Sequence, residues 1–187
     1  MKNLFILLFL LFLSACFGST PQSTFYMLTE EPGVAISNKK TQLAVEPIKI
    51  PAFLDKPQIV SLTKGGTQLN ISETQRWAEP LSSMIQRVII NDLATRLPKS
   101  DIRPKTFTRD KYDYILYIDV NKMNASFNEE IILSVWWSLI NKDGKTAYKT
   151  QSTFAMPLSD SYDDLVLKLS NLLARLSDVI AQKIIQI

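Results

Sequence analysis

Histidine is absent from this 187-residue sequence, and cysteine occurs once, at Cys16. Histidine is the commonest general base and the commonest metal ligand in proteins. A Ser/His/Asp triad, a Cys/His dyad and a zinc site are therefore excluded within this chain. The sequence has only five glycines, and it contains neither a P-loop nor a Gly-x-Gly-x-x-Gly fingerprint. These absences predict a protein that is not an enzyme and that holds no metal and no cofactor.

Carboxylates alone can perform acid–base chemistry, but their positions here indicate structural roles. Asp119 falls within a predicted strand, and Glu129 and Glu130 precede the next one. Asp163 and Asp164 fall in the first turn of a predicted helix, where acidic side chains complement the helix dipole. No pair of acids stands out as a catalytic pair.

The first residues describe a secretory signal peptide. Lys2 supplies a positive start, and residues 4–13 form an apolar run. That run is too short to span a membrane, which needs roughly 20 apolar residues. Leu13-Ser14-Ala15-Cys16 resembles the lipobox of bacterial lipoproteins. An ordinary cleaved signal, or a short anchor helix with a chance cysteine, is the alternative.

The lipobox resemblance implies that cleavage leaves Cys16 as the first mature residue. It would carry an S-diacylglyceryl group on its thiol and an N-acyl chain such as palmitate on its amine. Lipidation with more than one chain gives stable anchoring. Phe17, rather than an aspartate, follows the cysteine. By the same resemblance this implies the outer membrane, with the protein facing the periplasm.

Removal of residues 1–15 divides the rest into a tether, residues 16–24, and one domain, residues 25–187. It takes away Lys2 and leaves 20 basic residues against 18 acidic ones. This near balance gives no electrostatic basis for binding nucleic acid, and no polybasic patch for anionic lipid. We therefore expect no nucleic-acid partner, and membrane attachment depends on Cys16.

Hydrophobic periodicity predicts strands, a helix, more strands and a final helix. The first helix opens at Pro80 and stops before Pro98, and Asp92 is paired to Arg96 four residues on. Its apolar stripe consists of Leu81, Met84, Ile85, Val88, Ile89 and Leu93. The last begins after a Ser161 cap and runs for about 24 residues. Hairpin turns are predicted at 64–67 and 141–145. The predicted strands are residues 25–28, 42–50, 58–62, 68–71, 114–120, 131–140 and 146–156.

This order predicts an α+β fold, a two-layer sandwich with a mainly antiparallel sheet and both helices packed on one face. The helix-covered face is expected to carry Leu133, Val135 and Trp137. The other face is expected to be aromatic, as interface cores are, or else a half-exposed aromatic row on an open sheet. Its expected residues are Ile115, Tyr117, Ile132, Trp136 and Tyr148.

The final helix has a main apolar stripe that should pack against the sheet. Leu167, Ala174 and Ile185 lie opposite that stripe and are candidates for contact with a neighbouring subunit. The stripe consists of Leu165, Leu169, Leu172, Leu176, Val179, Ile180, Ile184 and Ile187.

Two stretches carry a family resemblance. They are Ile50-Pro51-Ala52-Phe53-Leu54-Asp55-Lys56-Pro57-Gln58-Ile59-Val60 and Arg76-Trp77-Ala78-Glu79-Pro80-Leu81. With Phe25-Tyr26-Met27-Leu28 just after the tether, the mature chain resembles the PqiC/YmbA-type lipoproteins, also called ABC-type transport auxiliary lipoprotein components. Members of that family often have Tyr at the position of Phe53 and Arg at that of Lys56.

The resemblance implies a non-enzymatic part of a lipid transport system that supports envelope integrity. Its implied partner is a ring-forming MCE-domain protein, docked at the outer membrane, and a ring-shaped partner favours several copies of the binder. Candidate contact residues are Trp136, Tyr117, Trp77, Arg76 and Phe53. For Trp77 a place in the core beneath the helix is the alternative. An assembly or pilot lipoprotein for an outer-membrane pore, and a lipid-binding carrier, remain open as alternative functions.

Overall fold

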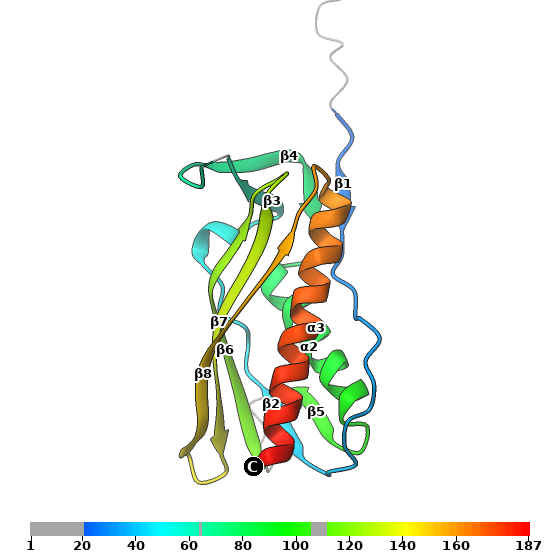
Figure 1. The fold of residues 1–187 in the computed structure, drawn as a ribbon, viewed down its shortest axis with the longest axis vertical. Helices are drawn as coiled ribbons and strands as arrows, with labels where there is room; N and C mark the ends of the chain where they lie inside the picture. The colour runs from blue at the N-terminus through cyan, green and yellow to red at the C-terminus, as the bar shows by residue number, and fades with distance from the viewer. Residues whose placement is uncertain (1–20, 64, 106–111) are drawn as a thin grey trace, which may run out of the picture.

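The computed structural model describes residues 21–63, 65–105 and 112–187. The predicted signal peptide, Cys16 and most of the predicted tether lie outside these residues. The described chain forms two helices and eight strands in two sheets, and Figure 1 shows them in an elongated molecule. The α+β class is confirmed.

The larger sheet has the strand order β5-β2-β6-β7-β8. β6 (Tyr114–Ala125), β7 (Glu130–Asn141) and β8 (Thr146–Pro157) form a long antiparallel meander. β2 (Gln42–Val45) runs parallel to both of its neighbours, β6 and β5 (Asp101–Pro104). The larger sheet is therefore mixed rather than mainly antiparallel, because β2 pairs in parallel with both of its neighbours. β5 was not predicted from the sequence.

The smaller sheet has the order β1-β4-β3 and closes one end of the molecule, where β1, β3 and β4 lie together in Figure 1. β1 (Thr24–Tyr26) runs parallel to β4 (Leu69–Trp77), and β3 (Gln58–Leu62) is antiparallel to it. Gly65 and Gly66 turn the β3–β4 hairpin with φ values of 92° and 70°. This is the left-handed region that glycine adopts readily, so the predicted hairpin is confirmed.

Pro47 explains why β2 ends earlier than the predicted strand 42–50. Proline has no N–H to donate to a sheet ladder. The chain nevertheless continues beside β6, because Glu46 N donates to Leu116 O at 3.0 Å and Lys49 N donates to Ile118 O at 3.2 Å. The connection to β3 then contains one turn of 3₁₀ helix, η2 (Ala52–Leu54).

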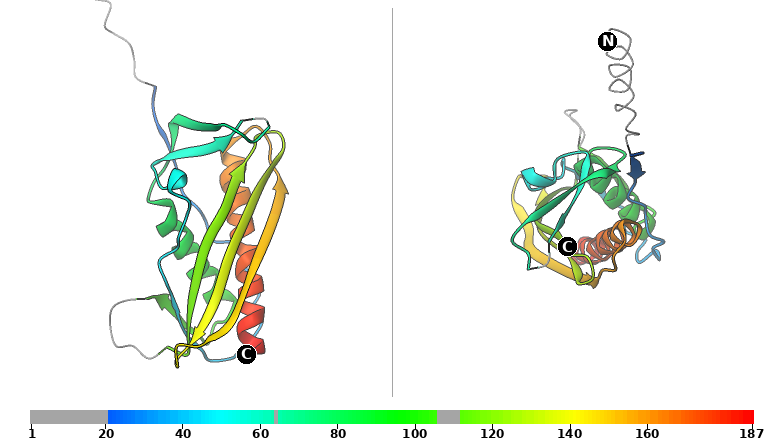
Figure 2. Two further views of the ribbon diagram at one scale, coloured as in Figure 1. Left: turned by 90° about the vertical axis from the view of Figure 1, so that its left-hand side faces the viewer. Right: turned by 90° about the horizontal axis from the view of Figure 1, so that it is seen from above.

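α2 (Leu81–Arg96) and α3 (Tyr162–Gln186) pack against each other and cover one face of the larger sheet (Figures 1 and 2). Leu133, Val135 and Trp137 are buried on that face, as expected. The predicted apolar stripe of α2 is confirmed, since all of its residues are buried: Leu81, Met84, Ile85, Val88, Ile89 and Leu93.

The predicted apolar stripe of α3 is partly wrong. Val179 and Ile187 are each 37% exposed, whereas Ala174, expected on the outside, is only 7% exposed. The reason is that α3 packs against α2 as well as against the sheet, which turns its buried arc toward Ala174. Leu167 and Ile185 are exposed, as expected. The Ser161 cap is confirmed, because Asp164 N donates to Ser161 Oγ at 3.4 Å.

Candidate functional site

The face of β6, β7 and β8 that the helices leave uncovered is called here the outer face. Trp136 of β7 lies at the centre of this face. It is paired with Asp119 of β6 on one side and with Gln151 of β8 on the other. In the next row, Tyr117 and Lys149 flank Ser138. Trp136 is 44% exposed and Tyr117 is 39% exposed, so two aromatic rings lie open on this face.

A lysine lies over each of these rings. Lys149 Nζ is 5.9 Å from the ring centroid of Trp136, and Lys105 Nζ is 5.9 Å from that of Tyr117. Lys105 also pairs with Glu46, whose carboxylate raises the pKa of that lysine. Cations near an aromatic face contribute about 0.5–1 kcal/mol at exposed sites. Exposed aromatics with a polar rim resemble the composition of protein interfaces.

Tyr148 does not join this face, contrary to the sequence prediction. It pairs with Leu139, and its ring centroid is 5.1 Å from that of Trp137 on the helix side of the sheet. Lys183 of α3 covers the Tyr148 ring, with Nζ 4.2 Å from its centroid. Alternation within β8 was visible in the sequence, but its register against β7 was not.

The other predicted contact residues lie elsewhere in the fold. Arg76 is half-buried in β4, paired with Phe25 of β1. Phe53 is 36% exposed in η2. Trp77 is only 4% exposed and belongs to the core, and its backbone N–H donates to Pro57 O at 2.7 Å. This burial supports the alternative in which Trp77 supports the fold beneath α2.

An open groove of about 1210 Å³ adjoins the outer face at the end of the molecule opposite the smaller sheet. Ile115 and Tyr117 line it from β6, and the Asp143-Gly144 turn lines it from the β7–β8 hairpin. Lysines and acids also line it, namely Lys40, Lys99, Lys142, Asp101 and Asp113. The groove therefore continues the aromatic surface of the outer face with a surface lined by charged side chains.

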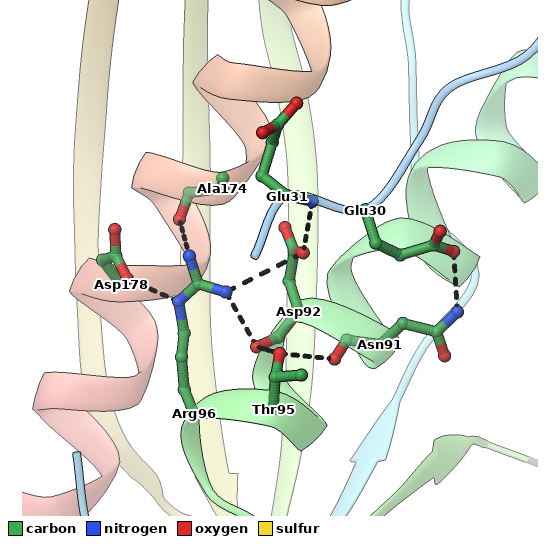
Figure 3. A network of polar contacts seen from close by, with 8 residues as sticks. All are labelled: Glu30, Glu31, Asn91, Asp92, Thr95, Arg96, Ala174 and Asp178. Carbon is green, nitrogen blue, oxygen red and sulfur yellow. Dashed lines mark hydrogen bonds and ion pairs between the residues drawn. The ribbon is translucent and has the colours of Figure 1, made fainter. Parts of the chain in front are cut away.

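A buried network of polar contacts joins α2 to α3 (Figure 3). Its centre is Arg96 of α2, whose side chain is 3% exposed. Its guanidinium donates to Asp178 Oδ1 at 2.5 Å and to the Ala174 carbonyl at 3.2 Å. It also donates to the Asp92 carbonyl at 2.9 Å, and its Nη1 lies 3.8 Å from Asp92 Oδ1. The predicted pair of Asp92 and Arg96 is confirmed, but as part of a larger network.

Residues 28–41, called here the N-terminal strap, cross over this network and link β1 to β2. Glu31 N donates to Asp92 Oδ1 at 3.2 Å, and Ile36 N donates to the Arg96 carbonyl at 2.9 Å. Gly33 packs so closely that a Cβ atom there would lie 2.7 Å from Arg96 Nη1. The strap and both helices are thus joined through one buried arginine.

Burial raises the pKa of Asp92 from 3.8 to about 6, although Arg96 and the Glu31 N–H act in the opposite direction. A carboxyl with a raised pKa is often found at a catalytic site. Here the side chain is fully buried, and the described residues leave it no path to a substrate. Asp92 Oδ2 has no hydrogen-bond partner among these residues. The network therefore joins α2, α3 and the strap and stabilises the fold.

Across residues 21–63, 65–105 and 112–187, no group of three or more acidic or cysteine side chains is placed to hold a metal ion. In the same part of the chain, no helix is long and apolar enough to cross a membrane. Local sequence patterns do not predict the strap contacts or the bond to Asp178, because the partners are distant along the chain.

Comparison with known proteins places this fold. The chain matches the family of ABC-type transport auxiliary lipoprotein components over residues 26–181. No curated protein sequence matches it significantly. A crystal structure of an uncharacterized protein is 22% identical, with a TM-score of 0.73 over 88% of this chain and 99% of that chain. Protein XCC0632 from Xanthomonas campestris, a DUF330 protein, is 18% identical, with a TM-score of 0.70 over 87% of this chain and 95% of that one.

At such identities the two crystal structures are evidence of the fold alone. The family match is evidence of membership, since it runs from the end of β1 into the last turns of α3. It also agrees with the PqiC/YmbA-type resemblance of residues 50–60 and 76–81. This chain therefore belongs to the family of ABC-type transport auxiliary lipoprotein components.

Proposed function

We propose that this chain is a non-enzymatic docking component of an MCE-type lipid transport system that supports envelope integrity. In this proposal the lipids on Cys16 hold it in the outer membrane, and the domain faces the periplasm. It binds the MCE-domain ring protein that reaches across from the inner membrane. Membership of an auxiliary lipoprotein family supports an accessory, membrane-anchored role of this kind.

The observation that carries the docking role is the outer face. Trp and Tyr are enriched where proteins bind one another, and one of each lies open on this face. Trp136 and Tyr117 lie in adjacent rows, and each has a lysine beside its ring. Catalysis has no comparable support, because Asp92, the one carboxyl of the described residues with a strongly raised pKa, is buried.

Several copies of the chain, arranged as a ring, would suit a ring-shaped partner. Docking through many copies multiplies weak contacts into a strong attachment without new contacts at any one site. β8 is the edge strand of the larger sheet and is 12 residues long, with a single lysine as its only charge. An exposed edge strand with little charge is a ready place for a further strand to pair. Native mass spectrometry of the detergent-solubilised lipoprotein measures the number of copies.

The test of the docking role is purification of the full lipoprotein, with Cys16 intact, from crosslinked cell envelopes, followed by mass spectrometry. We expect an MCE-domain protein among the recovered partners. Trp136→Ala should reduce its recovery, because removal of an interface tryptophan typically costs about 2 kcal/mol or more, which is over tenfold in affinity.

Val34→Ala in the N-terminal strap is the matched control, since Val34 is 82% exposed and lies away from the outer face. We expect this variant to recover the partner normally. Equal recovery by wild type, Trp136→Ala and Val34→Ala would remove Trp136 from the contact. Recovery of an outer-membrane pore protein, with no MCE-domain protein, would reassign the chain to pore assembly.

A further inference from the structure

We propose that the end of the molecule formed by the β3–β4 hairpin and β1 rests on the phospholipid surface that holds the lipid anchor. This end is called here the hairpin end. The inference rests on the proposed lipidation of Cys16, and it goes beyond the docking role because it assigns a second surface with a different occupant.

Three exposed apolar side chains lie on the strands of the hairpin end. Leu69 and Ile71 of β4 are 45% and 44% exposed, and cross-strand pairing sets them opposite Leu62 and Val60 of β3. On the neighbouring strand Phe25 is 64% exposed, which is unusual for so large an apolar side chain. These residues expose an apolar surface on the smaller sheet that no other part of the described chain covers.

The chain itself indicates what covers this surface. The described residues begin at the hairpin end, just before β1 (Figure 1). Eight residue steps separate Cys16 from Thr24, the first residue of β1. At about 3.5 Å per residue, this length reaches at most roughly 28 Å when fully extended. The lipid surface is therefore always within that reach of β1.

The length of the domain then sets its orientation. α3 begins beside β1, where the ring centroids of Tyr26 and Tyr162 are 6.4 Å apart, and it ends at the opposite end of the molecule (Figures 1 and 2). Its 25 residues span about 37 Å at 1.5 Å per residue. An inverted molecule would hold Thr24 about 37 Å from the lipid, beyond the 28 Å that the tether can reach. The tether length therefore excludes an inverted molecule with the opposite end on the membrane.

Neighbouring charges make the contact apolar rather than electrostatic. The β6–β7 turn lies beside β3, where Ser126 pairs with Leu62, and this turn carries the exposed acids Glu129 and Glu130. The exposed Lys122 of β6 lines the same hollow as these acids, so charges of both signs lie beside the hairpin and the contact does not depend on anionic lipid. The same turn carries Phe127, whose ring packs against Tyr162 at 4.9 Å. Tyrosine is among the residues enriched at the membrane–water interface.

The test uses the full lipoprotein in vesicles of phosphatidylcholine and phosphatidylethanolamine. Lipidation consumes the only cysteine, so an introduced cysteine is the single free thiol. Leu69→Cys places an environment-sensitive NBD label at the hairpin end, and Asp143→Cys places the same label in the exposed β7–β8 turn at the opposite end. Nitroxide-labelled lipids then report which label lies at the membrane surface.

We expect strong quenching and a blue-shifted emission for the label at residue 69, and almost no quenching at residue 143. A tether alone could bring the hairpin near the lipid, so a second pair of variants separates proximity from contact. A label on Phe25→Cys should lose most of its quenching when Leu69 and Ile71 are both replaced by serine. Unchanged quenching would overturn the apolar contact.

Absence of quenching at residue 69, with protein that floats with the vesicles and an acylated Cys16, would overturn this inference and leave the anchoring intact. Disulfide formation between the unlabelled cysteines at residue 69 of two copies would overturn it in favour of a second copy of the chain as the occupant. Protein with a free Cys16 thiol that does not float with the vesicles would overturn both the anchoring and the membrane contact.

Discussion

Replacement of Arg96 by methionine should lower the free energy of unfolding by about 3–5 kcal/mol, the usual cost of removing one partner of a buried ion pair. The side chain is 3% exposed, and methionine fills most of the space of its aliphatic stem. The loss is therefore mainly polar. The Ala174 carbonyl loses its 3.2 Å donor, and an unpaired buried carbonyl alone costs about 1–3 kcal/mol.

The two acids of the network respond differently. The Asp178 side chain is half-exposed and turns to water at little cost, whereas Asp92 is fully buried. Without Arg96, which holds the pKa of Asp92 down, that pKa rises further above its value of about 6. The folded protein then holds a proton that the unfolded chain releases, so the cost of Arg96→Met should grow as the pH rises above 6.

The assay is urea denaturation of the soluble Cys16→Ser protein, followed by tryptophan fluorescence at mildly acidic and at mildly alkaline pH. Arg87→Met on the same helix is the matched control. Arg87 pairs with Glu30 at 3.1 Å, but both side chains are more than a third exposed, so its loss should cost under about 1 kcal/mol. Equal destabilisation by the two substitutions, or a cost for Arg96→Met that does not depend on pH, would refute the reasoning.

Three further substitutions test the same core. Asp92→Asn should remove a stabilisation that is fully present below about pH 3.8 and is lost as the pH rises through about 6. The urea midpoint of the variant should therefore rise relative to that of wild type as the pH increases over that range. Gly33→Ala should cost about 1–3 kcal/mol in wild type but little in Arg96→Met, since its Cβ would meet Arg96 Nη1 at 2.7 Å. Trp137→Phe should cost about 1–2 kcal/mol in denaturation, because the 3.0 Å bond from Nε1 to Ser152 Oγ is lost.

Local patterns predicted the elements whose partners are close in sequence. The Asp143-Gly144 turn places Gly144 at a φ of 75°, which glycine adopts readily, and the β7–β8 hairpin follows. The prediction of the apolar stripe of α2 was correct because all of its positions face one continuous core. The aromatic pair Tyr117 and Trp136 was also placed on the uncovered face, as alternation along β6 and β7 predicts.

Long-range pairing was not predictable in the same way. β5 has a single apolar residue, Ile102, and owes its existence to parallel pairing with β2. The Asp178 side chain is half-exposed, yet it binds an arginine 82 residues earlier in the chain. Such contacts depend on which helix lies beside which, and periodicity along one helix carries no information about its neighbour.

The height of the docking site above the membrane follows from the two proposals together. Trp136 lies six residues from the start of β7, about 20 Å from the hairpin end at 3.4 Å per residue. A partner on the outer face must therefore approach to within about 20 Å of the lipid. If the hairpin contact sets this height, insertion of about ten Gly/Ser residues into the tether should leave partner recovery unchanged, because a flexible linker adds reach without force. The same insertion combined with Leu69→Ser and Ile71→Ser should lower recovery, since nothing then holds the domain at the surface. Loss of recovery with the insertion alone would mean that tether length, and not the hairpin, positions the domain.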